Sequence, residues 1–246
     1  FNPIFFGHMA INQKDTIVAF SNIWATYLII RYLKNQQIDE KRNRYTIFAG
    51  LVIGLGLGVR IVFLSTIIPI ILISIIDILF LKKITSNKFS NKKLIVDVFK
   101  VITIAYILMI SCWPDTHKNI FVLPFTLFVE SFNEIIGISL GLLNGNFYNT
   151  SATPKSYLIT NLFYKLPEFI LLGYLIFIYL ISKNKSFFNS QFKFFYTKLI
   201  LILFIIAFPN ILLLITPYKI YDGLRLFLYL IPYICIIPGL TIYYLI

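Results

Sequence analysis

The stretch that decides the fold is LILILFIIAFPNILLLIT at residues 199–216, an uncharged apolar run long enough to cross a bilayer. The rest of the chain has the same character, since hydrophobic residues make up 59% of it and charged residues only 13%. Soluble domains are about 45–50% apolar and about 25% charged. A soluble fold would leave large apolar patches in water, whereas lipid solvates them without penalty. The sequence therefore predicts an integral membrane protein.

The charged residues lie in short clusters between the apolar runs. Three basic clusters fall within residues 31–44, 82–93 and 183–198. Because Lys and Arg concentrate in cytoplasmic loops, we expect an even number of spans between successive clusters. The net charge of +12 then reflects loops held by anionic membrane lipids, and it does not indicate a nucleic-acid partner.

Seven apolar runs satisfy this rule. They are residues 16–33, two runs within 45–81 that turn near Arg60, and residues 94–112, 165–182, 199–216 and 226–246. The run 45–59 contains Gly50, Gly54, Gly56 and Gly58, a small-residue face suited to close helix packing or to a short tilted span. The predicted fold is one all-α, polytopic transmembrane helix bundle of about seven spans over residues 1–246.

This topology places residues 1–15, 113–164 and 217–225 on the non-cytoplasmic side. Lys155 is then outside, while Lys88 and Lys193 are cytoplasmic. Residues 121–143 are apolar, with Glu130, Asn133 and Glu134 on one helical face. An eighth span there would reverse every later loop, so an amphipathic helix at the outer interface is the better interpretation.

Candidate site residues gather near the start of the chain. His8, Asn12 and Asp15 are spaced i, i+4, i+7, so one helix would put them on a single polar face at the membrane surface. A His/Asp pair there suits a divalent cation, and Lys14 suits a phosphate-linked group. The competing interpretation is a helix cap at Asp15 beside a solvated His8. The sequence shows no metal-ligand spacing around the cysteines, and both Cys112 and Cys235 are interpreted as packing residues.

Two arginines border apolar spans on the outer side. Arg60 closes the Gly-rich run, and Arg225 follows Asp222 and Gly223 at the mouth of the last span. An arginine at membrane depth is costly and is usually retained against a partner, for which a lipid phosphate is well suited. The competing interpretation is that each guanidinium simply extends to the interface.

Several short motifs resemble one family. They are the run from Phe6 to Phe20, FGHMAINQKDTIVAF; the turn at residues 54–60; LNGNFY from Leu143, followed by Pro154 and Tyr157; LPEF from Leu166; and YDGLRLFL from Tyr221, followed by Pro232. They look like bacterial membrane glycosyltransferases of the protein O-mannosyltransferase (dolichyl-phosphate-mannose-protein mannosyltransferase-like) and aminoarabinose transferase type. These belong to the C-type glycosyltransferase superfamily.

The resemblance implies an enzyme of the bacterial inner membrane with its active site facing the periplasm. Such enzymes transfer a sugar from a polyprenyl-phosphate donor to an acceptor, which is a protein, lipid or glycan. It further implies an acidic residue at the start of a span, where Asp15 stands, and basic residues near the donor phosphate, where Arg60 and Arg225 stand. From their position beside Asp15, we expect His8, Asn12 and Lys14 to line the same active cavity. The general base of the family would lie upstream of Phe1.

The sequence departs from the family pattern in two respects. The first outer loop with its catalytic acid is absent, and Lys155 replaces a frequent aromatic residue. The chain starts at Phe1 and stops at Ile246 inside an apolar run, so we expect a piece of a longer polypeptide that is inactive alone. Rival interpretations are a secondary transporter, a polysaccharide ligase and a scaffold subunit without catalysis.

Overall fold

The computed structural model describes residues 2–86, 89–133, 140–215, 220 and 223–246. The chain is mostly helical, as the composition predicts. Its contacts divide it into two compact units, which we call the middle unit (Ile17–Glu134) and the terminal unit (Phe1–Thr16 with Ile135–Ile246). The terminal unit therefore unites the first residues of the chain with its second half.

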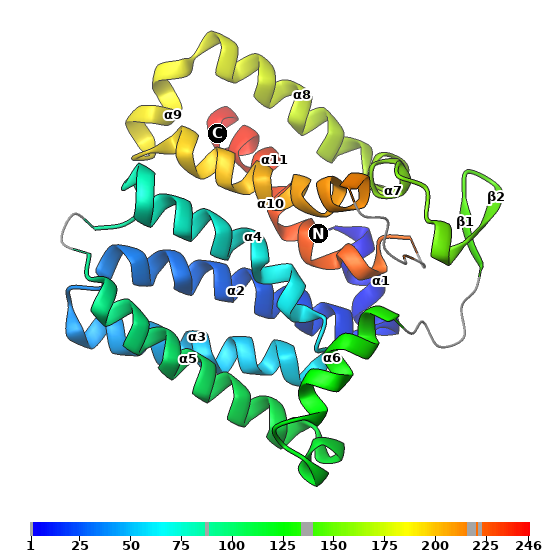
Figure 1. Cartoon of the computed structure of the whole chain (residues 1–246). Helices are drawn as coiled ribbons and strands as arrows, with labels where there is room; N and C mark the ends of the chain where they lie inside the picture. The colour runs from blue at the N-terminus through cyan, green and yellow to red at the C-terminus, as the bar shows by residue number, and fades with distance from the viewer. Residues whose placement is uncertain (1, 87–88, 134–139, 216–219, 221–222) are drawn as a thin grey trace. The chain divides into compact units, whose positions relative to one another are not determined.

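The middle unit consists of helices (Figure 1). They are α2 (Gln13–Asn35), which begins in the terminal unit, α3 (Asp39–Val59), α4 (Phe63–Ile76) with its π-helical extension η1 (Asp77–Leu81), α5 (Asn91–Cys112), the 3-10 turn η2 (Pro114–Lys118) and α6 (Leu123–Asn133). α5 starts where the Ser90 side chain accepts a hydrogen bond from the Lys93 backbone N–H. It ends before Pro114, which has no N–H to continue the helical hydrogen bonds.

Glycines let α3 and α5 pack closely. A Cβ on Gly54 would lie 2.9 Å from both Cα and the carbonyl oxygen of Ala105, and one on Gly58 would lie 2.9 Å from Cβ of Cys112. The opposite face of α5 is apolar and exposed, with Ile95, Phe99 and Ile102 at 70%, 71% and 59% exposure. Of the two interpretations of the Gly-rich run, close packing is confirmed.

Several buried polar groups in the middle unit are hydrogen-bonded to distant helices or to a neighbouring loop. The Tyr32 hydroxyl donates to Asp97 Oδ2 at 2.8 Å, and Gln36 Nε2 donates to the Tyr32 hydroxyl at 3.1 Å. Asp77, fully buried, accepts from the backbone N–H groups of Lys83, Ile84 and Thr85 at 2.7–3.1 Å. These contacts join α2 to α5 and tie the chain after α4 back onto its own end.

The terminal unit combines helices with one small hairpin. Its elements are α1 (Pro3–Ile11), β1 (Leu140–Leu143), β2 (Asn146–Asn149), η3 (Thr150–Ala152), α7 (Tyr157–Lys165), α8 (Glu168–Lys183), α9 (Lys185–Gln191), α10 (Phe195–Ile215), η4 (Arg225–Leu230) and α11 (Ile231–Leu245). Gly173 lets α8 approach α11, where the Thr241 hydroxyl donates to the Gly173 carbonyl at 2.9 Å. Phe177, Phe188 and Phe195 pack together where α8, α9 and α10 meet.

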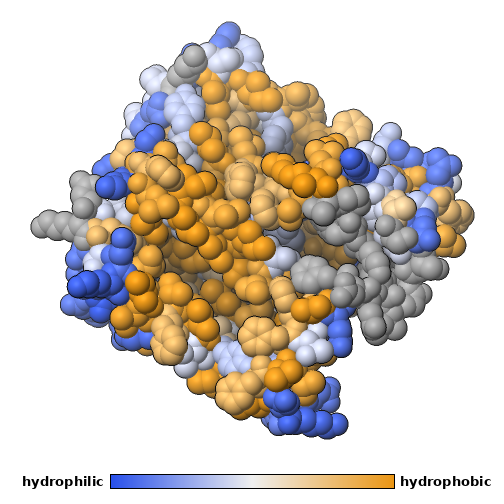
Figure 2. Space-filling view, viewed as in Figure 1, coloured by the Kyte–Doolittle hydropathy of each residue, from blue (hydrophilic) through white to orange (hydrophobic). Residues whose placement is uncertain are grey.

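Five helices have the length and apolar composition to cross a membrane. They are Gln13–Asn35, Phe63–Leu81, Asn91–Cys112, Phe195–Ile215 and Arg225–Leu245. A sixth arises if α7 and α8, bent by 102° at Leu166 and Pro167, form one broken span. Figure 2 shows hydrophobic residues over much of the face in view, as lipid-facing helices require. α3, which contains the predicted run 45–59, is not among these helices.

The expected helix over residues 121–143 is wrong in its last part. α6 ends at Asn133, and Leu140–Leu143 is a β-strand paired antiparallel with Asn146–Asn149. The Asn144-Gly145 dipeptide has φ of 51° and 78°, the positive values that a two-residue hairpin turn requires, and so imposes the hairpin. The position of Glu134 lies outside the described residues.

Because α3 and α5 approach closely, we expect one added methyl group to destabilise the protein at some glycines and not at others. Gly54→Ala places a Cβ against the Ala105 backbone, which must shift, so we expect a loss of about 1–3 kcal/mol in the free energy of unfolding. The matched control is Gly239→Ala, where no atom lies within 4 Å, and we expect it to be neutral or stabilising because Ala favours helices. Equal thermal stability of the two variants in detergent would contradict this packing.

Candidate functional site

A buried ion pair links the first and last thirds of the chain. Arg225 Nε donates to Asp15 Oδ2 at 2.9 Å, and the Asp15 side chain is only 5% exposed. Asp15 lies in the first turn of α2, where the helix dipole also favours its charge. Arg225 opens η4, directly before α11. Thus two residues that the sequence assigned to separate roles, one in the cavity and one at the phosphate, are direct partners.

The remaining N-terminal candidates do not share a helical face with Asp15. The single helix expected through His8, Asn12 and Asp15 is wrong, because α1 ends at Ile11 and Asn12 adopts φ −132° between α1 and α2. His8 and Asn12 nevertheless touch, with Nδ1 and Nδ2 at 3.4 Å. Lys14 is exposed.

Of the segment that precedes Arg225, the structure describes Ile220 and Gly223, and both are hydrogen-bonded to the hairpin region or α7. The Gly223 backbone N–H donates to the Tyr157 hydroxyl at 2.7 Å, and φ of +63° at Gly223 suits glycine. The Ile220 N–H donates to Thr153 Oγ1 at 3.2 Å, and the Ile220 carbonyl accepts from the Tyr148 hydroxyl at 2.9 Å. The hairpin and α7 therefore fix the approach of the chain to the ion pair.

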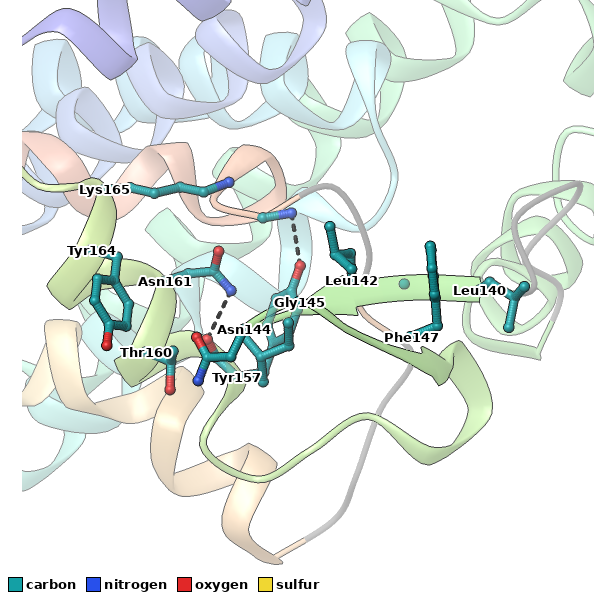
Figure 3. A pocket seen from close by; sticks show the side chains of 13 residues that line it. Leu140, Leu142, Asn144, Gly145, Phe147, Tyr157, Thr160, Asn161, Tyr164 and Lys165 are labelled. Carbon is teal, nitrogen blue, oxygen red and sulfur yellow. Dashed lines mark hydrogen bonds between the residues drawn. The ribbon is translucent and has the colours of Figure 1, made fainter.

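The same elements enclose a cavity of about 650 Å³ (Figure 3). The Asn161 Nδ2 donates to the Tyr157 carbonyl at 2.9 Å, and a Cβ at Gly223 would fall on the Lys165 ammonium. A side chain at position 223 would displace the end of that lysine. The lining residues are Leu140, Gly141, Leu142, Leu143, Asn144, Gly145, Phe147, Tyr157, Thr160, Asn161, Tyr164, Lys165 and Gly223.

Arg60 belongs to the middle unit, not to the unit that holds Arg225. It terminates α3, where its backbone N–H donates to the Gly56 carbonyl at 3.0 Å, and the residue is half-buried. A shared phosphate between Arg60 and Arg225 stays a prediction.

No group of three or more His, Cys, Asp or Glu side chains suited to a metal ion occurs among the residues that the structure describes. The terminal unit thus offers the Asp15–Arg225 ion pair together with the amide, hydroxyl and ammonium groups that line the cavity. Such groups bind anions and polyhydroxylated ligands through charge-assisted and neutral hydrogen bonds.

Comparisons of the chain with family models, curated proteins and solved structures find no match.

Sequence reasoning missed the residues that build the cavity. Tyr157 and the Asn144-Gly145 turn were noted only as parts of the resemblance, and Lys165 only as the start of a span. The Asn-Gly dipeptide was the available signal, since it is the strongest short-range mark of a hairpin. No local pattern connects Asn161 with Gly223, because their proximity arises from tertiary structure.

The Asp15–Arg225 pair predicts coupled losses of stability. Asp15→Asn and Arg225→Gln should each lower the free energy of unfolding by about 1–3 kcal/mol, because each removes a charge-assisted hydrogen bond of 2.9 Å from a largely buried pair. In a double-mutant cycle the second substitution should cost much less than the first.

The control is Asp39→Asn, which removes a carboxylate that is 75% exposed beside Arg42. Its expected cost is below about 1 kcal/mol. Strictly additive effects of Asp15→Asn and Arg225→Gln, measured by thermal unfolding in detergent, would show that the pair does not stabilise the protein.

Proposed function

We propose that this chain is part of an integral membrane glycosyltransferase. It transfers a sugar from a polyprenyl-phosphate donor to an acceptor at the non-cytoplasmic face of a bacterial inner membrane. The observation that carries this proposal is the Asp15–Arg225 ion pair. It joins the FGHMAINQKD motif to the YDGLR motif across 210 positions of sequence.

Other motif segments of the resemblance lie in the same unit. The Tyr157 hydroxyl accepts from the Gly223 N–H of the YDGLR segment, and the Tyr148 hydroxyl of the LNGNFY segment donates to Ile220, the residue directly before YDGLR. The turn at residues 54–60 is the exception, because it belongs to the middle unit. Clustering of motifs that are distant in sequence supports a shared site, since packing alone does not require it.

The proposed reaction breaks the bond between the anomeric carbon and the phosphate oxygen of the donor. An acceptor hydroxyl attacks the anomeric carbon and gives its proton to a carboxylate, while the polyprenyl phosphate leaves with the bonding electron pair. The departing phosphate gains negative charge, so fixed cationic groups lower the barrier. Arg225 is proposed for this role, with Arg60 as a second cation.

Asp15 is proposed to position Arg225. A guanidinium carries five N–H donors in a planar fork, and the bond from Nε to Asp15 fixes the orientation of that plane. His8, Asn12 and Lys14 are proposed to border the same cavity from α1 and the start of α2.

The proposed topology retains about seven spans and puts the three basic clusters in the cytoplasm. α6 is proposed to lie at the outer interface, which its exposed Phe125 and Val129, four residues apart on one face, support. α8 has 16 residues, which is about 24 Å of helix and near the lower limit for a span.

Donor use should depend on both arginines. In membranes that contain the full-length protein, Arg60→Gln and Arg225→Gln should each weaken donor use by about 10- to 100-fold, because a charge-assisted bond to phosphate contributes about 1.5–3 kcal/mol. Lysine at either position should restore only part of the donor use, since an ammonium lacks the planar arrangement of donors in a guanidinium. The measurement is release of free polyprenyl phosphate against donor concentration.

Arg44→Gln serves as the control, because Arg44 is exposed and lies in a cluster assigned to the cytoplasm. Expression of each variant is matched before the assay. Wild-type donor dependence in both Arg60→Gln and Arg225→Gln would refute the phosphate-binding role.

Topology is tested separately with introduced cysteines. Lys155→Cys, outside, should react with an impermeant thiol reagent in spheroplasts, whereas Lys193→Cys should react only after the membrane is opened. Both lysines are exposed, so reactivity reports the side of the membrane and not burial. Labelling of position 193 in intact spheroplasts would overturn the assignment; Lys88, of the second cluster, lies outside the described residues.

A further inference from the structure

The cavity between the hairpin and α7 has two chemically different walls. Thr160, Asn161 and Lys165 come from α7, with Thr160 beside the hairpin tip at Asn144, whereas Leu142 and Phe147 lie along the strands (Figure 3). The Lys165 ammonium lies at Gly223. Its volume of about 650 Å³ lies within the range of small-molecule sites, about 300–1,000 Å³. A ligand for this cavity needs hydrogen-bonding groups on one side and an apolar face on the other.

The α7 wall supplies several hydrogen-bonding side chains at fixed positions. Asn161 is 7% exposed, and its Nδ2 bond to the Tyr157 carbonyl fixes the amide with Oδ1 toward Gly223. The Thr160 hydroxyl and the Asn144 amide also line the cavity. A ligand with a hydrocarbon surface would leave these groups unpaired, whereas one with several hydroxyl groups satisfies them.

Lys165 gives the cavity a positive charge. Among the residues that the structure describes, no carboxylate lines the cavity and none lies within ion-pair distance of the Lys165 ammonium. The ammonium is placed by its packing against Gly223. A ligand with an anionic group would therefore match the charge of Lys165.

The hairpin wall supplies the apolar face. Phe147 is 75% exposed and Leu142 is 57% exposed, although both lie at the cavity. The C–H face of a pyranose ring packs well on an aromatic ring, while the hydroxyl groups at its edge remain available for the amides opposite.

We propose that this cavity binds a sugar that carries an anionic group, a carboxylate or a phosphate. Lys165 pairs with the anion, Asn161 and Thr160 bond the ring hydroxyls, and Phe147 covers the ring face. The assignment rests on the cavity alone and does not depend on the transfer reaction proposed above. Binding is tested without a donor and without turnover, so its failure leaves that reaction untouched.

The test is ligand-observed saturation-transfer NMR on the purified full chain in nanodiscs. The probes are glucuronic acid, glucose 6-phosphate, glucose and inorganic phosphate, with dodecyl phosphate as a lipid-like competitor. We expect at least one acidic sugar to bind more tightly than either glucose or phosphate alone, and the two acidic sugars distinguish a carboxylate from a phosphate ligand.

Two exposed positions are substituted so that folding is little affected. Lys165→Gln should weaken binding of the acidic sugar by roughly tenfold and leave binding of glucose unchanged. The control is Lys155→Gln, which replaces an exposed lysine outside the cavity and should change the binding of neither sugar. Phe147→Ala should weaken the binding of both sugars, whereas Phe169→Ala, at an exposed position on α8, should not.

Three results would overturn the proposal. They are no binding of any sugar at millimolar concentration, phosphate that binds as tightly as glucose 6-phosphate, and dodecyl phosphate that binds more tightly than every sugar. Binding that Lys165→Gln and Lys155→Gln reduce equally would likewise refute the role of this cavity.

Discussion

The ion pair between Asp15 and Arg225 is the interaction on which the terminal unit depends. Withdrawing a charge from water is costly, and the bond of 2.9 Å between these two opposite charges offsets part of that cost. The start of α2 must therefore stay against η4, although the two residues are 210 positions apart. Gly223 and its bond to Tyr157 bring the chain to Arg225 in the required direction, and the hairpin holds Ile220 in turn. The cavity exists because these segments are held there.

The middle unit meets the same constraint with hydrogen bonds as well as an ion pair. Its buried carboxylates, Asp77 and Asp97, lie in helices that are otherwise apolar enough to cross a membrane. Polar groups at such depth must find partners inside the protein. Asp77 accepts from backbone N–H groups, whereas Asp97 accepts from the Tyr32 hydroxyl and lies 3.4 Å from Arg42 Nε. Further along α3 and α5, glycines bring the two backbones together.

The membrane character and the close packing of the Gly-rich run were predictable, because both follow from local composition. Two helix predictions were wrong for the same reason, one through Leu143 and one through His8 and Asp15. Both were based on the periodicity of side chains, which does not show where a residue such as Asn144 or Asn12 ends the helical conformation. Asp15 and Arg225 were both selected as site residues, yet nothing in the sequence pairs them. An ion pair between residues far apart in the sequence depends on tertiary packing, as does the contact of Lys165 with Gly223.

The convergence of the two ends of the chain is tested most directly by a disulfide. Asn2 Nδ2 lies 4.0 Å from Cys235 Sγ, so Asn2→Cys in a Cys112→Ser background should crosslink to the native Cys235 under mild oxidation in membranes. Met9→Cys lies two turns along α1, about 10 Å away, and should not crosslink. Rapid crosslinking of position 2 alone is the predicted result. No crosslink from position 2, or equal crosslinking from positions 2 and 9, would contradict the docking of α1 on α11.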